Sequence, residues 1–252
     1  MMTAESRKQK ILEALTKDGS VRVTALSQQF RVSEVTIRND LADMEYKGLL
    51  TRVHGGAVSS YKPYYSMNLN HRLTTNEEGK KVIAKKIAGV VDNNDTLMLN
   101  SGPTTVMIFR ALPQNLSLNI VTNSVSIALE AADHPNFNVL LLGGQINSKY
   151  QFTYGGDAVC QLRQYHADKV ILSIDGIDIA SGFSTFYDKE AEIDRVMLEQ
   201  ANTSFVAAGF SKLNRTAFTK ISDLSVADYI VTDRSVPSKL KREVTKQGVG
   251  IL

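Results

Sequence analysis

The stretch Ser33-Glu34-Val35-Thr36-Ile37-Arg38-Asn39-Asp40-Leu41 decides the fold of the first part of this 252-residue chain. Ser33 is a suitable N-cap, and the apolar residues after it recur at helical spacing. The pattern predicts a helix that runs to about Lys47 and stops at Gly48. We expect this helix to bury four apolar side chains, namely Val35, Ile37, Leu41 and Met44.

Two further helices are predicted before this stretch. Residues 10–15 place Ile11, Leu12 and Leu15 on one helical face, and Gly19 stops that helix. Residues 21–23 are strand-like, and Thr24 is a candidate cap for a second helix over residues 25–30. The order is helix, short strand, helix, tight turn, helix.

The third helix has the composition of a DNA recognition helix. Small polar and basic residues fill its first two turns, where they can approach base edges in the major groove and bond phosphates. A hairpin over residues 49–58, with Gly55-Gly56 at its turn, would act as a wing that projects Arg52 and His54. Asp40 is acidic and is expected to pair with a nearby cation. The candidate DNA-binding residues are Arg22, Ser33, Glu34, Thr36, Arg38, Asn39, Arg52 and His54.

Composition excludes some classes of protein but does not identify the function. The chain is 43% hydrophobic and 22% charged, an ordinary globular balance, with a formal net charge of +3. It has no apolar run near the ~20 residues that span a bilayer and no secretory signal pattern. Cys160 is the single cysteine, so no internal disulfide forms, and we expect it to be a small core residue. We expect the protein to be cytoplasmic. No motif indicates a metal or a cofactor.

The remaining chain predicts an α/β domain. Residues 59–76 are rich in Ser, Tyr, Asn and Pro and are expected to be a linker between domains at 1–58 and 77–252. Short apolar runs then alternate with helical segments, which predicts a mostly parallel sheet covered on both faces. The expected strands are 96–99, 118–122, 138–142, 169–174, 204–208 and 228–232, and the expected helices are 104–112, 124–132, 156–165, 189–201 and 238–246.

Polar residues follow several of these strands, at the sheet edge where open α/β folds bind ligands. Residues 100–105 join a strand to a helix, with Pro103 at the first helical position. Free N–H groups and hydroxyls there form either an anion site or a plain turn. Carboxylates, amides and a lysine after the other strands would suit the hydroxyls and charge of a sugar phosphate.

The first part of the chain resembles the DeoR family of bacterial sugar-metabolism repressors. The resemblance lies in Arg7, Ile11 and Leu15 at intervals of four, in residues 33–41, and in the wing at residues 52–57. Residues 77–252 resemble the effector domain of that family, which looks like ribose-5-phosphate isomerase. The resemblance implies a repressor of a sugar-utilisation operon that binds double-stranded operator DNA and a phosphorylated sugar. It also implies a homo-oligomer, either a dimer or a tetramer, that does not associate with a membrane.

The matching motifs imply an effector site. Its candidate residues are Asn100, Ser101, Gly102, Thr104, Thr105, Thr122, Asn123, Gly143, Gly144, Asp175, Gly176, Asp178, Glu190 and Lys212. Asn100 departs from the family's usual Asp, Pro103 from Ser or Thr, and Gly209-Phe210 from Asp-Ser. The loss of two carboxylates points either to altered hydroxyl recognition or to a weakened site.

Two alternatives stay open. In a sugar-phosphate isomerase, Asp175 and Glu190 would supply the carboxylates for proton transfer. The isomerase sequence continues after its Asp-Gly-x-Asp with a Glu and a catalytic Lys, and residues 179–183 of this chain contain neither, so we expect no enzyme. In a constitutive DNA-binding protein, the second domain would only oligomerise.

Overall fold

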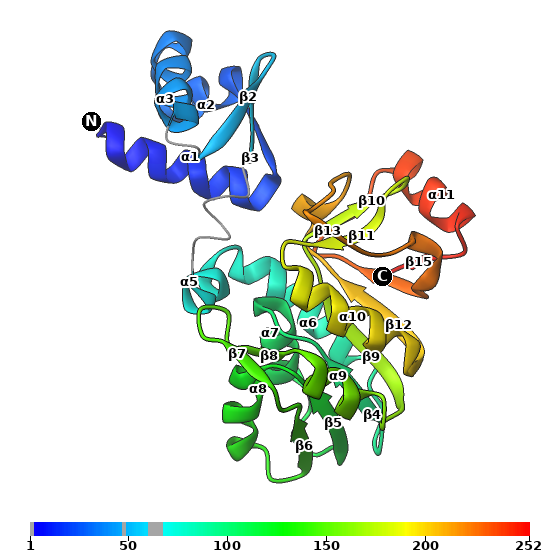
Figure 1. Ribbon diagram of the computed structural model, residues 1–252. Helices are drawn as coiled ribbons and strands as arrows, with labels where there is room; N and C mark the ends of the chain where they lie inside the picture. The colour runs from blue at the N-terminus through cyan, green and yellow to red at the C-terminus, as the bar shows by residue number, and fades with distance from the viewer. Residues whose placement is uncertain (1–2, 47–48, 60–67) are drawn as a thin grey trace. The chain divides into compact units, whose positions relative to one another are not determined.

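The computed structural model describes residues 3–46, 49–59 and 68–252, in two compact units, Met1–Asn76 and Glu77–Leu252 (Figure 1). In the first unit, β1, β3 and β2 form an antiparallel sheet beside the helices. Lys47 and Gly48 lie outside the described residues. The elements are α1 (Ala4–Asp18), β1 (Ser20–Arg22), α2 (Val23–Phe30), α3 (Glu34–Tyr46), β2 (Leu50–Val53), β3 (Gly56–Ser59) and α5 (Leu69–Thr74).

The expected helix, strand, helix, turn, helix and wing are all present in this unit. Gly19 ends α1 in the left-handed conformation, with φ 75°, and its N–H donates to the Leu15 carbonyl at 2.8 Å. The predicted cap at Thr24 is wrong, because α2 already begins at Val23. The Val23 N–H instead donates to the Gly55 carbonyl of the wing turn at 2.9 Å, so backbone from the hairpin serves the start of α2.

Helix α3 buries Ile37, Leu41 and Met44 in the core of this unit, each at 1% exposure or less. The prediction that Val35 is also buried is wrong, since its side chain is 62% exposed. At 3.6 residues per turn, nine residues complete two and a half turns, so Val35 lies on the opposite side of α3 from Met44. The apolar residue at position 35 therefore faces outward.

The second unit contains a seven-stranded parallel sheet of order β15-β14-β12-β9-β4-β5-β6. Its strands are β4 (Thr96–Leu99), β5 (Leu118–Thr122), β6 (Phe137–Leu141), β9 (Ala167–Ser173), β12 (Ala201–Ala207), β14 (Tyr229–Val231) and β15 (Gly250–Ile251). Its helices are α6 (Glu77–Ala88), α7 (Pro103–Ala111), α8 (Val125–Glu130), α9 (Gly156–Leu162), α10 (Asp188–Glu199) and α11 (Ser238–Lys246). The predicted parallel α/β class is confirmed.

Six expected apolar runs form six of these strands, and the five expected helices form α7 to α11. The sequence pattern missed α6 and the short strands of two small antiparallel sheets. Those strands are β7 (Gln145–Asn147), β8 (Phe152–Tyr154), β10 (Gly176–Asp178), β11 (Gly182–Thr185) and β13 (Thr219–Ser222). Three short 3-10 turns are η1 (Ala131–Asp133), η2 (Phe210–Lys212) and η3 (Leu224–Val226).

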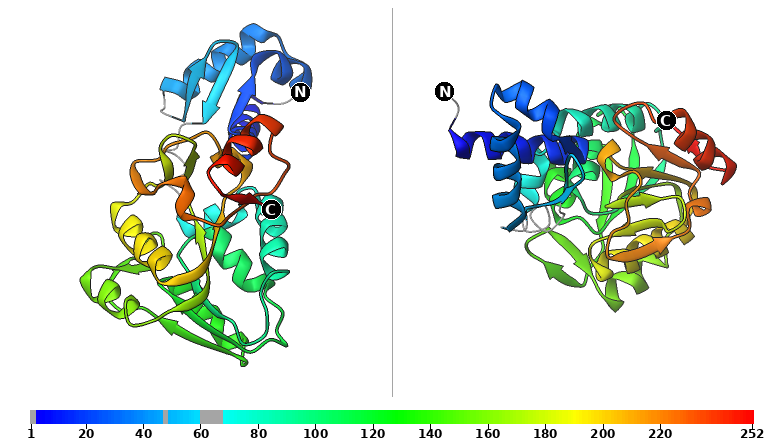
Figure 2. Two further views of the ribbon diagram at one scale, coloured as in Figure 1. Left: turned by 90° about the vertical axis from the view of Figure 1, so that its right-hand side faces the viewer. Right: turned by 90° about the horizontal axis from the view of Figure 1, so that it is seen from above.

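The order of the strands reverses between β4 and β9, which are neighbours in the sheet. From β4 the chain proceeds outward through β5 to β6, and from β9 it proceeds the other way through β12 to β14. Right-handed crossovers in opposite directions place helices on both faces of the sheet (Figure 2). The crevice at the carboxyl ends of β4 and β9 is therefore the topological switch point, where such sheets bind ligands.

Two smaller predictions need correction. Residues 68–74 of the expected linker contain helix α5, whose N-cap Asn68 accepts a hydrogen bond from the His71 N–H at 3.0 Å, while residues 60–67 lie outside the described residues. Cys160 is exposed, because α9 turns Ala158 and Leu162 toward the core and Cys160 away from it. None of the helices within the described ranges is long and apolar enough to cross a bilayer.

Candidate DNA-binding surface and sensor site

Helix α3 presents an exposed stripe opposite its buried one. Val35, Arg38 and Asn39 are exposed, and their spacing of three and four residues places them on one face. The half-buried Ala42 and Tyr46, which is 92% exposed, continue the same line. A helix with one face in the core and its opposite face free can enter the major groove.

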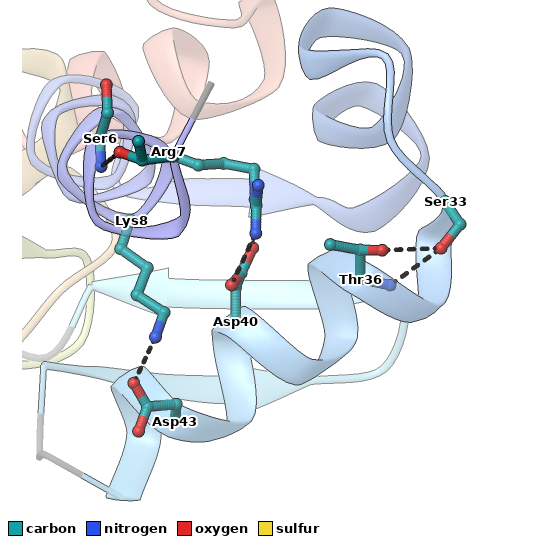
Figure 3. Close-up of polar contacts among 8 residues, drawn as sticks. Ser6, Arg7, Lys8, Ser33, Thr36, Asp40 and Asp43 are labelled. Carbon is teal, nitrogen blue, oxygen red and sulfur yellow. Dashed lines mark hydrogen bonds and ion pairs between the residues drawn. The ribbon is translucent and has the colours of Figure 1, made fainter. Parts of the chain in front are cut away.

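The N-terminal end of α3 is capped by the hydroxyl of Ser33, which also contacts the hydroxyl of Thr36. The Thr36 N–H donates to Ser33 Oγ at 3.1 Å, so the predicted N-cap is confirmed. The Thr36 Oγ1 lies 2.9 Å from the same Ser33 oxygen (Figure 3). Both hydroxyls are thus engaged in holding the first turn, and Thr36 lies beside the exposed stripe rather than on it.

Arg38 forms an ion pair with Glu34 one turn earlier on α3. Both side chains are well exposed, at 57% for Arg38 and 40% for Glu34, and exposed pairs of this kind contribute little to stability. The guanidinium is therefore held along the helix surface by a contact that a phosphate or a base edge can replace. Asn39 lies beside it with an exposed amide.

A buried ion pair sets the position of α3 against α1. Arg7 donates through both Nε and Nη2 to the carboxylate of Asp40, with 3.1 Å between Nη2 and Oδ1, and each side chain is at most 8% exposed (Figure 3). The prediction that Asp40 pairs with a nearby cation is confirmed. Lys8 adds a second contact, 2.6 Å from Asp43. Bidentate arginine pairs fix geometry, so α3 is held in a defined orientation.

The wing is anchored to the other end of α3. Arg52 donates through its backbone N–H and its Nε to Glu45, at 2.8 and 2.7 Å, and these bonds lower the pKa of Glu45. His54 lies exposed in the turn between β2 and β3. Arg22 is exposed on β1 directly opposite Gly56, where a side chain would come within 2.0 Å of the Val21 carbonyl oxygen. The wing turn and Arg22 are therefore adjacent.

The second cluster lies at the switch point of the sheet. Asn100, which follows β4, accepts a hydrogen bond from the Ser173 N–H at 2.8 Å and donates to the Ser173 carbonyl at 3.0 Å. Its Nδ2 also donates to Asp194 Oδ1 of α10 at 2.8 Å. Every polar atom of this side chain has a partner, and the amide links the ends of β4 and β9 to α10.

A chain of hydrogen bonds connects the other polar groups at this edge. Ser101 Oγ donates to Glu190 at 2.9 Å, and Thr185 Oγ1 lies 2.8 Å from Glu190 and 3.1 Å from Asp175. Lys212 Nζ donates to the other oxygen of Asp175 at 3.2 Å. The predicted residues Asn100, Ser101, Asp175, Glu190 and Lys212 are thus brought together.

Two members of this cluster were absent from the sequence-based site, namely Thr185 and Asp194. Asp194 has no exposed surface, and its Oδ2 has no hydrogen-bond partner among the described residues. Burial raises its pKa well above the ordinary aspartate value, and the nearby charge of Glu190 adds to this. The signal for Asp194 was its spacing of four from Glu190, which places both carboxylates on one face of α10.

The loop before α7 is tightly built. Gly102 has φ 139°, and a side chain there would come within 3.0 Å of Ser173. Ser101, Thr104 and Thr105 are at most 8% exposed, and Thr105 Oγ1 donates to the Gly102 carbonyl at 3.0 Å. The loop is thus ordered by its own contacts, with the start of α7 next to Ser101.

Six other predicted residues make local contacts within the fold. Asp178 accepts backbone N–H bonds from Ala180 and Ser181, at 3.1 and 2.8 Å, which close the hairpin between β10 and β11 and lower its pKa. Asn123 donates to the Thr153 carbonyl at 3.2 Å. The other four contact backbone or side chains nearby, namely Thr122, Gly143, Gly144 and Gly176.

Comparisons with known proteins cover both units. Residues 7–62 match the family model described as the DeoR-like helix-turn-helix domain, and residues 75–234 match the DeoR C terminal sensor domain. The "Putative aga operon transcriptional repressor" of Escherichia coli O157:H7 is 33% identical over 252 residues, covering 99% of this chain and 93% of that protein. The "Glycerol-3-phosphate regulon repressor" of Escherichia coli is 30% identical, covering 97% of this chain and 96% of that protein.

Solved structures with a similar fold were also found. Ribose 5-phosphate isomerase A from Methanocaldococcus jannaschii is 18% identical, with a TM-score of 0.40 over 55% of each chain. The eIF2B delta protein from Chaetomium thermophilum is 16% identical, with a TM-score of 0.48 over 67% of this chain and 59% of that one. The family assignment rests on the two family models and the curated relatives: the chain belongs to the DeoR family of transcriptional regulators.

Proposed function

We propose that this protein represses a sugar-utilisation operon and that a phosphorylated sugar, bound at the switch point of the second unit, controls its affinity for operator DNA. The observation that carries the proposal is α3, which has one face fixed in the core and the opposite face exposed. The names of the two curated relatives support repression rather than activation, since both are described as repressors. Acting on chromosomal DNA places the protein in the cytoplasm.

On the DNA side, α3 enters the major groove and the wing contacts the backbone. Arg38 and Asn39 reach base edges, with arginine suited to guanine and asparagine to adenine. Arg22, Arg52 and His54 surround the wing turn and contact phosphates or the minor groove. Ser33 and Thr36 hold the first turn of α3 and offer hydroxyls to phosphate. Each cation that neutralises a phosphate steepens the salt dependence of binding by about one unit of log–log slope.

On the sugar side, the carboxylates of Asp175 and Glu190 accept hydrogen bonds from hydroxyl groups, and Lys212 supplies positive charge. The start of α7 offers N–H groups and the Thr104 hydroxyl to the phosphate, while Thr105 holds the loop through its bond to the Gly102 carbonyl. Glu190 accepts a bond from Ser101, so a sugar hydroxyl that binds this carboxylate must displace or join that contact. The effector shifts DNA affinity only if it binds one arrangement of the protein more tightly.

A two-step experiment tests this function. Sequences that bind the full-length protein are selected from a random duplex library, and their affinity is measured by fluorescence anisotropy with and without a panel of phosphorylated sugars and alditols. The proposal expects an enriched sequence and at least one phosphosugar that weakens binding. If saturating phosphosugars leave the affinity unchanged, sensing is wrong, and if no sequence is enriched, the regulator function is wrong.

We propose that the bound sugar is sensed and not converted. Asp175 and Glu190 are bridged by the single hydroxyl of Thr185, and Asp175 also accepts from Lys212 and from the Phe186 N–H at 3.0 Å. Both carboxylates thus serve as acceptors in a fixed network. Incubation with pentose and hexose phosphates, followed by NMR, is expected to show no isomer; turnover would favour the isomerase alternative.

We further propose that the protein acts as a homo-oligomer. Helix-turn-helix readers bind paired half-sites about one helical turn apart, and a symmetric dimer presents two recognition helices at that spacing. Light scattering is expected to give a dimer or a tetramer. A monomer at micromolar concentration that binds a single half-site would contradict this.

A further inference from the structure

The exposed stripe of α3 contains one apolar side chain near its start. Val35 is 62% exposed and lies one turn before Asn39 and three residues before Arg38. Single exposed valines are common on protein surfaces, so exposure alone assigns no role. Its position does, because residues at the N-terminal end of a recognition helix contact base edges directly.

The major groove offers one apolar group, the C5-methyl of thymine. The other base edges there present hydrogen-bond donors and acceptors, which Arg38 and Asn39 can pair but Val35 cannot. A valine pressed against polar base edges would desolvate them without replacing their hydrogen bonds, which is unfavourable. The chemistry of this position therefore selects for a thymine methyl.

We propose that Val35 is a specificity-determining residue that reads thymine through its methyl group, next to the bases that Arg38 and Asn39 read. This inference rests on the proposed DNA-binding function and adds one base preference to it. Side chains one turn apart on a helix have Cβ atoms about 5–6 Å from each other, so the thymine lies within about two base pairs of the base that Asn39 contacts.

Val35 can be changed without disturbing the fold of α3. The residues that hold α3 in the core, among them Ile37, Leu41 and Met44, lie on the other side of the helix. Alanine is also a better helix former than valine. A Val35→Ala variant thus removes both γ-methyl groups, which reach furthest from the helix, and keeps the helix. Circular dichroism with a thermal melt verifies that the fold is kept.

The test is a double-mutant cycle between protein and DNA. In the enriched duplex from the random library, each thymine is replaced singly by deoxyuridine, which lacks only the C5-methyl group. The dissociation constant is measured by anisotropy at one salt concentration for the wild-type protein and for Val35→Ala. Val226→Ala is the matched control, because Val226 is 50% exposed and lies in the second unit.

One thymine per half-site is expected to matter. Its replacement by deoxyuridine is expected to weaken wild-type and Val226→Ala binding about fourfold, which corresponds to the burial of one methyl group, and to weaken Val35→Ala binding less. The inference would be overturned if deoxyuridine weakened binding equally in wild type and Val35→Ala, if it weakened binding at no thymine, or if the enriched site contained no thymine. Each of these outcomes would leave the proposed DNA binding intact. Failure to enrich any sequence would overturn the proposed function itself.

Discussion

At the scale of single residues, the proposed sensor site is organised by an amide that bridges three parts of the fold. Asn100 contacts Ser173 at the end of β9 and the buried carboxyl of Asp194 on α10. The family resemblance puts an Asp at position 100, and in this chain a carboxylate there would lie against that of Asp194. The departure at position 100 thus fits the buried acid on α10.

The burial of Asp194 predicts that stability depends on pH and that Asp194→Asn removes this dependence. The ordinary pKa of an aspartate is about 4, whereas burial raises that of Asp194 in the folded chain. Between these values the unfolded chain has lost the proton and the folded chain keeps it, so rising pH favours unfolding. The free energy of unfolding of Asp194→Asn, relative to wild type, is expected to rise by about 1.4 kcal/mol per pH unit above about pH 4, until the folded pKa is passed.

Urea denaturation between pH 4.5 and pH 8, in steps of about half a unit, measures this difference. Asp188→Asn, an exposed change at the start of the same helix, is the control and is expected to run parallel to wild type. Parallel curves for Asp194→Asn and wild type would show that Asp194 is ionised in the folded chain.

An exchange of the carboxyl and amide groups tests the contact between Asn100 and Asp194. Asn100→Asp places two buried carboxyl groups in contact and removes the donor to the Ser173 carbonyl, so it is expected to destabilise the chain by about 3 kcal/mol at neutral pH. The double variant Asn100→Asp with Asp194→Asn restores one carboxyl and one amide. It is expected to regain part of the loss in the same urea measurement; additive losses would mean that the two side chains do not interact.

At the scale of elements, the exposed face of α3 depends on how its first turn is held. Ser33 caps the helix through the Thr36 N–H, and the neighbouring α1 has an equivalent cap, in which Thr3 Oγ1 accepts from the Ser6 N–H at 3.2 Å. The two caps are alike in chemistry, but only one of them lies at the end of a proposed recognition helix.

Ser33→Ala and Thr3→Ala form a matched pair. Each is expected to lower the free energy of unfolding by about 1 kcal/mol, the usual value of an N-cap. Only Ser33→Ala is expected to weaken binding of the selected duplex, because it loosens the turn that carries Val35. Anisotropy and urea denaturation measure the two effects, and an equal loss of DNA affinity in both variants would contradict the role of α3.

The sequence predicted most elements and only part of the site, for physical reasons that particular residues make clear. Apolar periodicity identified the strands and helices because burial enforces it. It misplaced Val35, since an apolar residue beside buried ones was assigned to the core although it lies on the opposite face of α3 from Met44. Helix α6 was missed because no motif marked residues 77–88.

The sensor cluster needed tertiary structure. Asp175, Glu190 and Lys212 follow different strands or begin a helix, and the sheet topology brings them together as expected for a switch point. Asp178 belongs to the same Asp-Gly-Ile-Asp motif as Asp175, yet its carboxylate closes a hairpin turn by accepting hydrogen bonds from nearby backbone N–H groups. Asp194 was missed because a buried carboxyl inside an amphipathic helix carries no sequence signal beyond its spacing from Glu190.

At the scale of the whole molecule, control by an effector requires that the two units are coupled. If a phosphosugar weakens binding of the selected duplex by some factor, that duplex must weaken binding of the phosphosugar by the same factor. We expect this equality when the sugar is titrated calorimetrically with and without saturating duplex. A sugar affinity that saturating duplex leaves unchanged would contradict control of DNA binding by the bound sugar.

The measurement that tests the account most directly compares two arginines. Arg38 on α3 and Arg163 in the second unit are similarly exposed, at 57% and 52%, and each is paired with a glutamate. Arg38→Gln is expected to weaken binding of the selected duplex by roughly 5- to 150-fold, the weight of a specific base contact, while Arg163→Gln binds as wild type. Equal affinities for the two variants would contradict the claim that the exposed face of α3 reads DNA.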